Sequence, residues 1–142
     1  MFSIQEVNWK LVNNTYYYMG KDTNSILKFT LNEAQDHCKE NRGKLAEPQN
    51  RKEMDNLDIF AELDSGWIGI KWHQNCTMSY VSNSATIEKS WVRGHEDYNC
   101  STFNVTKCGS MDTLATELKI FDCNKKLKFF ICEQKRGIVY IL

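Results

Sequence analysis

The chain has 142 residues, 42% of them hydrophobic, and its 18 basic and 18 acidic side chains give a formal charge of zero. This length fits one domain, 1–142, with a core at about 7–135. Zero net charge disfavours nucleic acid as a partner, and no apolar run is long enough to span a bilayer. The first residues lack a signal-peptide pattern, so we expect any targeting segment to lie outside this sequence.

Cysteines and glycosylation sequons indicate the secretory pathway. Six cysteines are an even number, and none has the Cys-x-x-Cys spacing of zinc or redox sites. N-x-S/T sequons begin at Asn13, Asn75, Asn99 and Asn104. A cytosolic protein with free thiols and chance sequons is the alternative. We expect an extracellular, disulfide-bonded glycoprotein, either secreted or the ectodomain of a membrane protein whose anchor is not in this chain.

The first elements are predicted to be a short hairpin and two helices. Aromatic and β-branched residues flank Asn13-Asn14, a typical turn sequence. A capping box of Thr30 and Glu33 predicts the start of a helix, which ends with a left-handed cap at Arg42-Gly43. A second amphipathic helix is predicted at about 50–62.

The middle and end of the chain are predicted to be β-rich. The short apolar run at 67–72 indicates a central buried strand. Residues 73–107 are rich in Asn, Ser and Thr, which indicates a long loop region with short strands such as 78–81. Alternating segments at 118–123 and 127–132 predict a closing hairpin.

This order of elements resembles the C-type lectin-like domain. The resemblance rests on Trp67-Ile68-Gly69-Ile70, on its place after a helix that carries Cys38, and on the ending Phe130-Ile131-Cys132-Glu133. It covers about residues 7–135 and implies an α+β fold in which two helices pack on antiparallel sheets beside a long disulfide-held loop region. The disulfides that the resemblance implies are Cys38–Cys132, Cys108–Cys123 and, with the remaining cysteines, Cys76–Cys100.

The resemblance also locates a sugar site that this sequence has altered. Sugar-binding members hold calcium with a Glu-Pro-Asn or Gln-Pro-Asp triplet, a further acid and a Trp-Asn-Asp motif, because calcium takes many oxygen ligands. In this chain His95-Glu96-Asp97 replaces the triplet, Thr106-Lys107 stands in place of the acid, and Lys119-Ile120 replaces Asn-Asp. We therefore expect no calcium, no other metal and no cofactor.

Members that lack these ligands often bind proteins through the same loop face. We expect the domain to be a non-enzymatic receptor or ligand in immune-type recognition, with a cell-surface or secreted protein as its partner. A divergent lectin that binds glycan through Glu96 and Asp97, a homodimer, and a toxin-like or structural oligomeric module are the alternatives. The contact residues implied by the resemblance are Arg93, His95, Glu96, Asp97 and Tyr98.

Other side-chain groupings are weaker candidates. His37 and Cys38 are adjacent on a helix and therefore point about 100 degrees apart, which excludes a nucleophile–base pair. A zinc site at His95 with nearby cysteines fits no common spacing. The lysines of the closing segment indicate a solvated face or, as the sharper alternative, a patch for an acidic ligand. These lysines are Lys125, Lys126 and Lys128.

Overall fold

The structure, a computed structural model, describes residues 8–24, 26–60, 64–92, 105–112 and 117–135. The strands within these ranges are β1 (Lys10–Val12), β2 (Thr15–Lys21), β3 (Lys44–Leu45), β4 (Ser65–Trp72), β5 (Met78–Tyr80), β6 (Thr86–Ile87), β7 (Lys107–Asp112), β8 (Glu117–Asp122) and β9 (Phe129–Lys135). The helices are α1 (Leu31–Glu40), α2 (Arg51–Asn56) and the 3-10 turns η1 (Leu57–Phe60) and η2 (Lys89–Trp91). This is the α+β arrangement predicted from the sequence.

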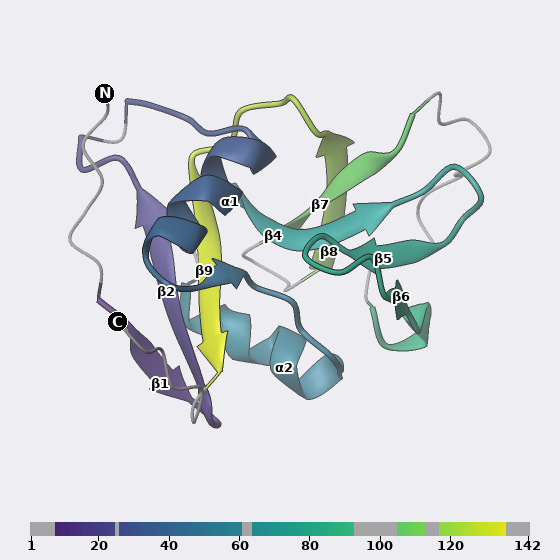
Figure 1. The fold of residues 1–142 in the computed structure, drawn as a ribbon, viewed down its shortest axis with the longest axis horizontal. Helices are drawn as coiled ribbons and strands as arrows, with labels where there is room; N and C mark the ends of the chain where they lie inside the picture. Colours follow the sequence, from purple (N-terminus) through teal and green to yellow (C-terminus); the bar gives the residue numbers. More distant parts are fainter. Residues whose placement is uncertain (1–7, 25, 61–63, 93–104, 113–116, 136–142) are drawn as a thin grey trace.

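The strands join in one mixed sheet (Figure 1). Its order is β1-β2-β9-β4-β5-β6, with β3 beside β9 and the β7–β8 ribbon attached to β4. The pairing of β4 with β9 is parallel, with Gly66 opposite Phe129 and Trp67 opposite Phe130. The predicted antiparallel character therefore holds for the other strand pairs but not for this central one.

The predicted closing hairpin is wrong. β8 pairs with β7, whereas β9 runs between β2 and β4. Leu127, in the connection between β8 and β9, forms an isolated antiparallel bridge with Phe29, which lies just before α1. The connection therefore pairs with the start of the α1 segment and not with β8. Alternation of apolar and polar residues identifies a strand correctly but carries no information about its partner.

The central strands are apolar on both faces because the sheet separates two cores. Successive strand residues point to opposite faces, so Trp67 packs with α1 on one side and Ile68 with α2 and η1 on the other. Phe130 and Ile131 divide between the two cores in the same way. Continuous burial on both faces explains why β4 and β9 are runs of large apolar residues.

The two predicted helices form with the expected N-terminal caps. Thr30 and Glu33 make the complete capping box of α1, and Asn50 accepts from the backbone N–H of Glu53 to cap α2. At the end of α1 the left-handed residue is Arg42, with φ of 65°. Gly43 is needed for a different reason, since an added Cβ would lie 2.7 Å from the carbonyl oxygen of Glu133.

The other local predictions are met within the described ranges. Asn13 and Asn14 both have positive φ, 49° and 70°, and close the β1–β2 hairpin. The second helix is α2 followed by η1, so its predicted region tightens into a 3-10 turn at Leu57. Residues 61–63, its predicted end, lie outside the described ranges.

Disulfides connect elements that are distant in the sequence. Cys38 of α1 is bonded to Cys132 of β9, and Cys108 of β7 to Cys123, which follows β8. Both pairs are those implied by the resemblance. Cys76 is also disulfide-bonded. Its predicted partner, Cys100, lies outside the described residues, so that pairing stays a prediction.

Candidate functional site: the loop face and two polar clusters

The predicted contact residues Arg93, His95, Glu96, Asp97 and Tyr98 lie outside the described residues. The structure does describe the segment from which they continue. Val92 is buried in the core, Trp91 packs against the same core, and the carbonyl oxygen of Trp91 lies 3.4 Å from Nη1 of Arg51. The predicted loop face therefore continues from a segment that is anchored to α2.

Three of the positions that the resemblance assigns to calcium ligands, Lys107, Lys119 and Ile120, carry basic or apolar side chains. The ammonium of Lys107, at the start of β7, forms an ion pair with Asp122 of β8. Lys119 on β8 is exposed, and the following Ile120 packs partly into the core. Among the described residues no group of His, Cys, Asp and Glu side chains is arranged to hold a metal ion. Ammonium groups donate hydrogen bonds but do not coordinate calcium.

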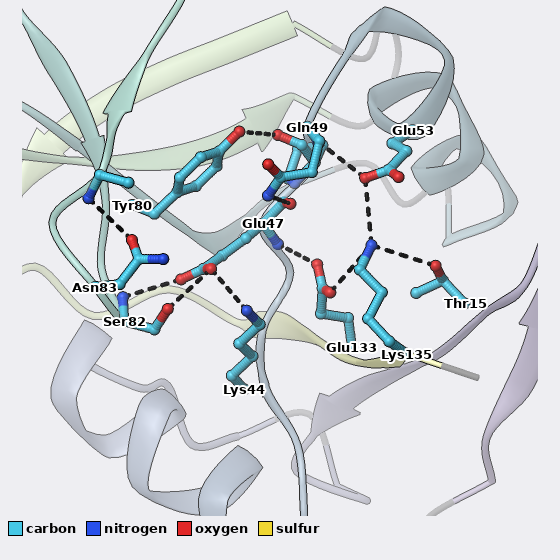
Figure 2. Close-up of polar contacts among 12 residues, drawn as sticks. Thr15, Lys44, Glu47, Gln49, Glu53, Tyr80, Ser82, Asn83, Glu133 and Lys135 are labelled. Carbon is cyan, nitrogen blue, oxygen red and sulfur yellow. Dashed lines mark hydrogen bonds and ion pairs between the residues drawn. The ribbon is translucent and has the colours of Figure 1, made fainter. Parts of the chain in front are cut away.

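A first polar cluster, the carboxylate network, joins the segment between β3 and α2 to the turn after β5 and to β9 (Figure 2). Its centre is Glu47, only 1% exposed, which accepts hydrogen bonds from the backbone N–H and the hydroxyl of Ser82, each 2.9 Å long. Lys44 lies 3.0 Å from the same carboxylate. The Glu47 side chain therefore ties the turn after β5 to the segment after β3.

The second acid of the carboxylate network is Glu133, also 1% exposed. One of its oxygens accepts from the backbone N–H of Glu47, while the other lies 3.5 Å from Nζ of Lys135, as an ion pair without a hydrogen bond. Lys135 also lies 3.4 Å from Glu53 of α2. Burial raises the pKa of the Glu133 carboxyl, and the lysines nearby oppose that shift only in part.

The carboxylate network depends on close backbone approach and on a buried phenol. An added Cβ on Gly69 would lie 2.9 Å from Cγ of Glu47, which explains the glycine of the Trp-Ile-Gly-Ile strand. The Tyr80 hydroxyl donates to the carbonyl oxygen of Pro48 at 2.7 Å. Burial, and then the charge of Glu47, raises the pKa of Tyr80 to about 12. Because its donors and acceptors are largely satisfied internally, this network is structural.

A second polar cluster lines an open cavity of about 540 Å³ on another part of the sheet. We call it the His73 groove. Its lining residues come from the end of β4, the turn after it, β5, the turn between β5 and β6, β6 and the residue before β7. They are Lys71, His73, Gln74, Asn75, Thr77, Met78, Ser79, Ser84, Thr86 and Thr106.

The described sequons lie on exposed turns. Asn13 is exposed in the β1–β2 turn, and its amide nitrogen donates to the Asn56 side chain at 3.0 Å. Asn75 is exposed at the edge of the His73 groove, where its Oδ1 accepts from the backbone N–H and hydroxyl of Thr77. Asn99 and Asn104 lie outside the described residues.

Sequence reasoning did not predict either polar cluster. Glu47 and Glu133 are 86 residues apart, and His73 and Thr106 are 33 apart, so no local spacing connects them. One signal was present for the His73 groove. Polar residues alternate with core residues in Lys71-Trp72-His73, and again in Thr77-Met78-Ser79, which indicates one polar face on adjoining strands.

Comparison with known proteins agrees with this fold. The lectin C-type domain family matches residues 27–134, more than half of the chain, so the chain belongs to this family. Domains of this family are generally extracellular recognition modules without enzymatic activity. No helix in the described ranges has the length and apolar character needed to cross a membrane. No curated protein matches the chain in sequence.

Solved structures give the same result at low sequence identity. The cow C-type carbohydrate-recognition domain of CD23, determined in the presence of a GlcNAc2Man3 oligosaccharide, is 18% identical with a TM-score of 0.71, covering 92% of this chain and 95% of its own. The mouse scavenger receptor C-type lectin domain is 18% identical with a TM-score of 0.70, covering 91% and 96%. The trimeric Kupffer cell receptor Clec4f is 18% identical with a TM-score of 0.69, covering 93% and 85%. These likenesses establish the fold.

Proposed function

We propose that this domain is an extracellular recognition module that binds a protein partner without calcium, through the loop face predicted to include Arg93 and Tyr98. The observation that supports this proposal most directly is that basic side chains stand at positions where family members hold calcium. Lys107 and Lys119 place ammonium groups on β7 and β8, and a divalent cation beside them would be repelled. Arg and Tyr side chains are frequent hot spots in protein interfaces, because each buries a large area and keeps a polar group.

Calorimetry of calcium addition to the disulfide-intact domain is the first test. We expect no heat of binding and no thermal stabilisation. Binding in the micromolar to low-millimolar range, with a rise in the unfolding temperature, would contradict the calcium-independent proposal and direct the search to glycans. The variant Lys119→Asn with Ile120→Asp restores two oxygen ligands. It shows whether the basic side chain is what prevents calcium binding.

The class of partner is tested on cells. A fluorescent tetramer of the domain is added to cells in calcium or in EDTA, before and after protease treatment of the cell surface. A protein partner predicts binding that resists EDTA and is lost with protease. Arg93→Ala and Tyr98→Ala should reduce the signal, whereas Lys10→Ala, an exposed lysine of β1, should not. Binding that survives protease but is lost with glycosidase would contradict the proposal.

Glycan binding is the second candidate function. It is favoured by the solved neighbour that was determined with an oligosaccharide. On this hypothesis Glu96 and Asp97 supply the remaining ligands, and a chelator abolishes binding. Assembly is a separate question, which the trimeric Clec4f structure raises for this chain. Light scattering with and without reductant separates a monomer from a homodimer or a disulfide-linked oligomer.

A further inference from the structure

The His73 groove has the size and polarity of a ligand site. Its volume of about 540 Å³ lies within the range of roughly 300–1,000 Å³ common for small-molecule pockets. Hydroxyl and amide side chains dominate the lining, and Met78 is the apolar member. Among the described residues that line the groove there is no Phe, Tyr or Trp side chain and no carboxylate, and His73 carries the one ring. Such a surface is unsuited to a flat apolar ligand and suited to a small polar one.

The strand register explains how this polar surface is built. Lys71 of β4 pairs with Ser79 of β5, and Ser79 pairs with Thr86 of β6, so these side chains project from one face of the sheet. The alternate residues Ile70 and Tyr80 point into the core. The groove is therefore a row of polar groups on rigid strands that are held from behind by packed apolar side chains.

His73 is fixed in position within the groove. Its Nε2 lies 2.7 Å from Oγ of Ser79, and its Nδ1 lies 3.3 Å from Oγ1 of Thr106. Its backbone N–H donates to the carbonyl oxygen of Thr77 at 2.8 Å. A ring held from both sides needs little ordering when a ligand binds, which favours affinity.

Charge defines the class of ligand. Lys71 is half-buried, and it has no ion-pair partner within the part of the chain that the structure describes. An ammonium in this setting favours a carboxylate or sulfate, since charge-assisted hydrogen bonds are the stronger ones. Ser, Thr, Asn and Gln side chains both donate and accept, which matches the hydroxyls of a sugar ring.

We propose that the His73 groove binds an acidic monosaccharide unit, with the acid group on Lys71 and the ring hydroxyls along the Ser79–Thr86 row. The site needs no calcium, and it is argued from residues other than the predicted contact residues at 93–98. It therefore does not depend on the proposed function. Asn75, at the edge of the groove, is a predicted glycosylation site, so occupancy of its sequon would control access to the groove.

The test uses nuclear magnetic resonance on the disulfide-intact domain prepared without N-glycans, with EDTA present. Glucuronate is the probe, with glucose as the neutral match and inorganic sulfate as the anion without a sugar ring. We expect glucuronate to shift the signals of Lys71, His73 and Thr86, and to bind at least about tenfold more tightly than glucose or sulfate. Equal binding of glucose, equal binding of sulfate, or no binding of glucuronate would each overturn the proposal.

Variants test the assigned roles. Lys71→Met keeps most of the side-chain stem and removes the charge, and should weaken glucuronate binding about tenfold. Thr86→Val, an exposed isosteric change, should weaken it by a smaller factor. The control Lys10→Met, at an exposed position on β1, should stay within about twofold of the parent. An unchanged affinity in both groove variants, or signals shifting only outside the groove, would contradict the assignment. Because no protein partner and no calcium are present, failure of this test leaves the proposed function standing.

Discussion

The carboxylate network and the His73 groove are both polar clusters against the same sheet, yet they differ in how their groups are used. Glu47 is almost fully buried and satisfied by Ser82 and Lys44. Lys71 in the groove is half-buried and has no ion-pair partner among the described residues. A polar cluster near a core therefore indicates a binding site only where hydrogen-bond donors, acceptors or charges remain for a ligand.

Glu133 of the carboxylate network follows Cys132, and Lys71 of the groove pairs with Cys108, and the two disulfides that these cysteines form should differ in effect. Cys38–Cys132 closes 94 residues and Cys108–Cys123 closes 15. From chain entropy we expect Cys38→Ala with Cys132→Ala to cost about 4.7 kcal/mol of unfolding free energy, and Cys108→Ala with Cys123→Ala about 3 kcal/mol. Urea denaturation of both double variants measures the difference. Equal losses would show that native packing, rather than loop length, sets the contribution of each bridge.

Removing the central acid of the carboxylate network should cost more than any other single side-chain change in the two clusters. Glu47→Ala leaves the Ser82 N–H and hydroxyl without their acceptor, while the Lys44 ammonium stays hydrated, so we expect a loss of about 2 to 3 kcal/mol. The matched control is Asp36→Ala, an exposed acid of α1, for which we expect less than about 0.5 kcal/mol. Similar unfolding midpoints for the two variants would contradict the structural role of Glu47.

The groove should tolerate a comparable deletion much better. Ser79→Ala removes the 2.7 Å contact with His73 and should cost about 1 kcal/mol. Ser90→Ala, at an exposed position of η2, is the control and should be neutral. If Ser79→Ala were as destabilising as Glu47→Ala, the groove would have to be regarded as a second structural network.

The smallest loss of stability is expected of Glu133→Gln, because the amide oxygen can still accept from the Glu47 N–H and Lys135 keeps Glu53. The substitution is expected to change how the free energy of unfolding depends on pH. Burial raises the pKa of Glu133, so the folded state binds the proton more tightly than the unfolded state. Stability should fall as pH rises from the unfolded value of about 4.5 through the folded pKa.

The variant lacks this titration, so the parent should lose stability relative to Glu133→Gln across that pH window. Thermal unfolding at a series of pH values measures the gap. Glu40→Gln, a change to an exposed acid at the end of α1, is the matched control. A gap that closes with rising pH would contradict the direction of the shift.

Local chemistry made much of the fold predictable. The Thr30–Glu33 capping box and the Asn13-Asn14 turn are decided within a few residues, and both form as predicted. Strand partners are decided by packing over long distances, which is why the pairing predicted for β9 with β8 is wrong. The family resemblance implied Cys38–Cys132 correctly, although no local rule connects residues that far apart.

The sites were less predictable than the fold. The predicted contact residues at 93–98 lie outside the described ranges, so they stay predictions. The sequence identifies Glu133 only as part of the strand ending, and its burial beside Glu47 depends on contacts that only the fold creates. No pattern in the sequence places His73 beside Ser79 and Thr106, because these two partners lie on different elements.

The antiparallel pairing of β2 with β9 sets how the domain responds to mechanical force. Thr15, where β2 begins, lies opposite Lys135, where β9 ends, so a pull applied outside both strands separates them from one end, one hydrogen-bonded pair at a time. Such unzipping resists little force until it reaches Tyr18 opposite Cys132. From there the tension on β9 passes through the disulfide to Cys38, so the chain between these two cysteines, which includes β4, is not extended. The cores around β4 would therefore stay intact under tension that has already opened the outer strand pair.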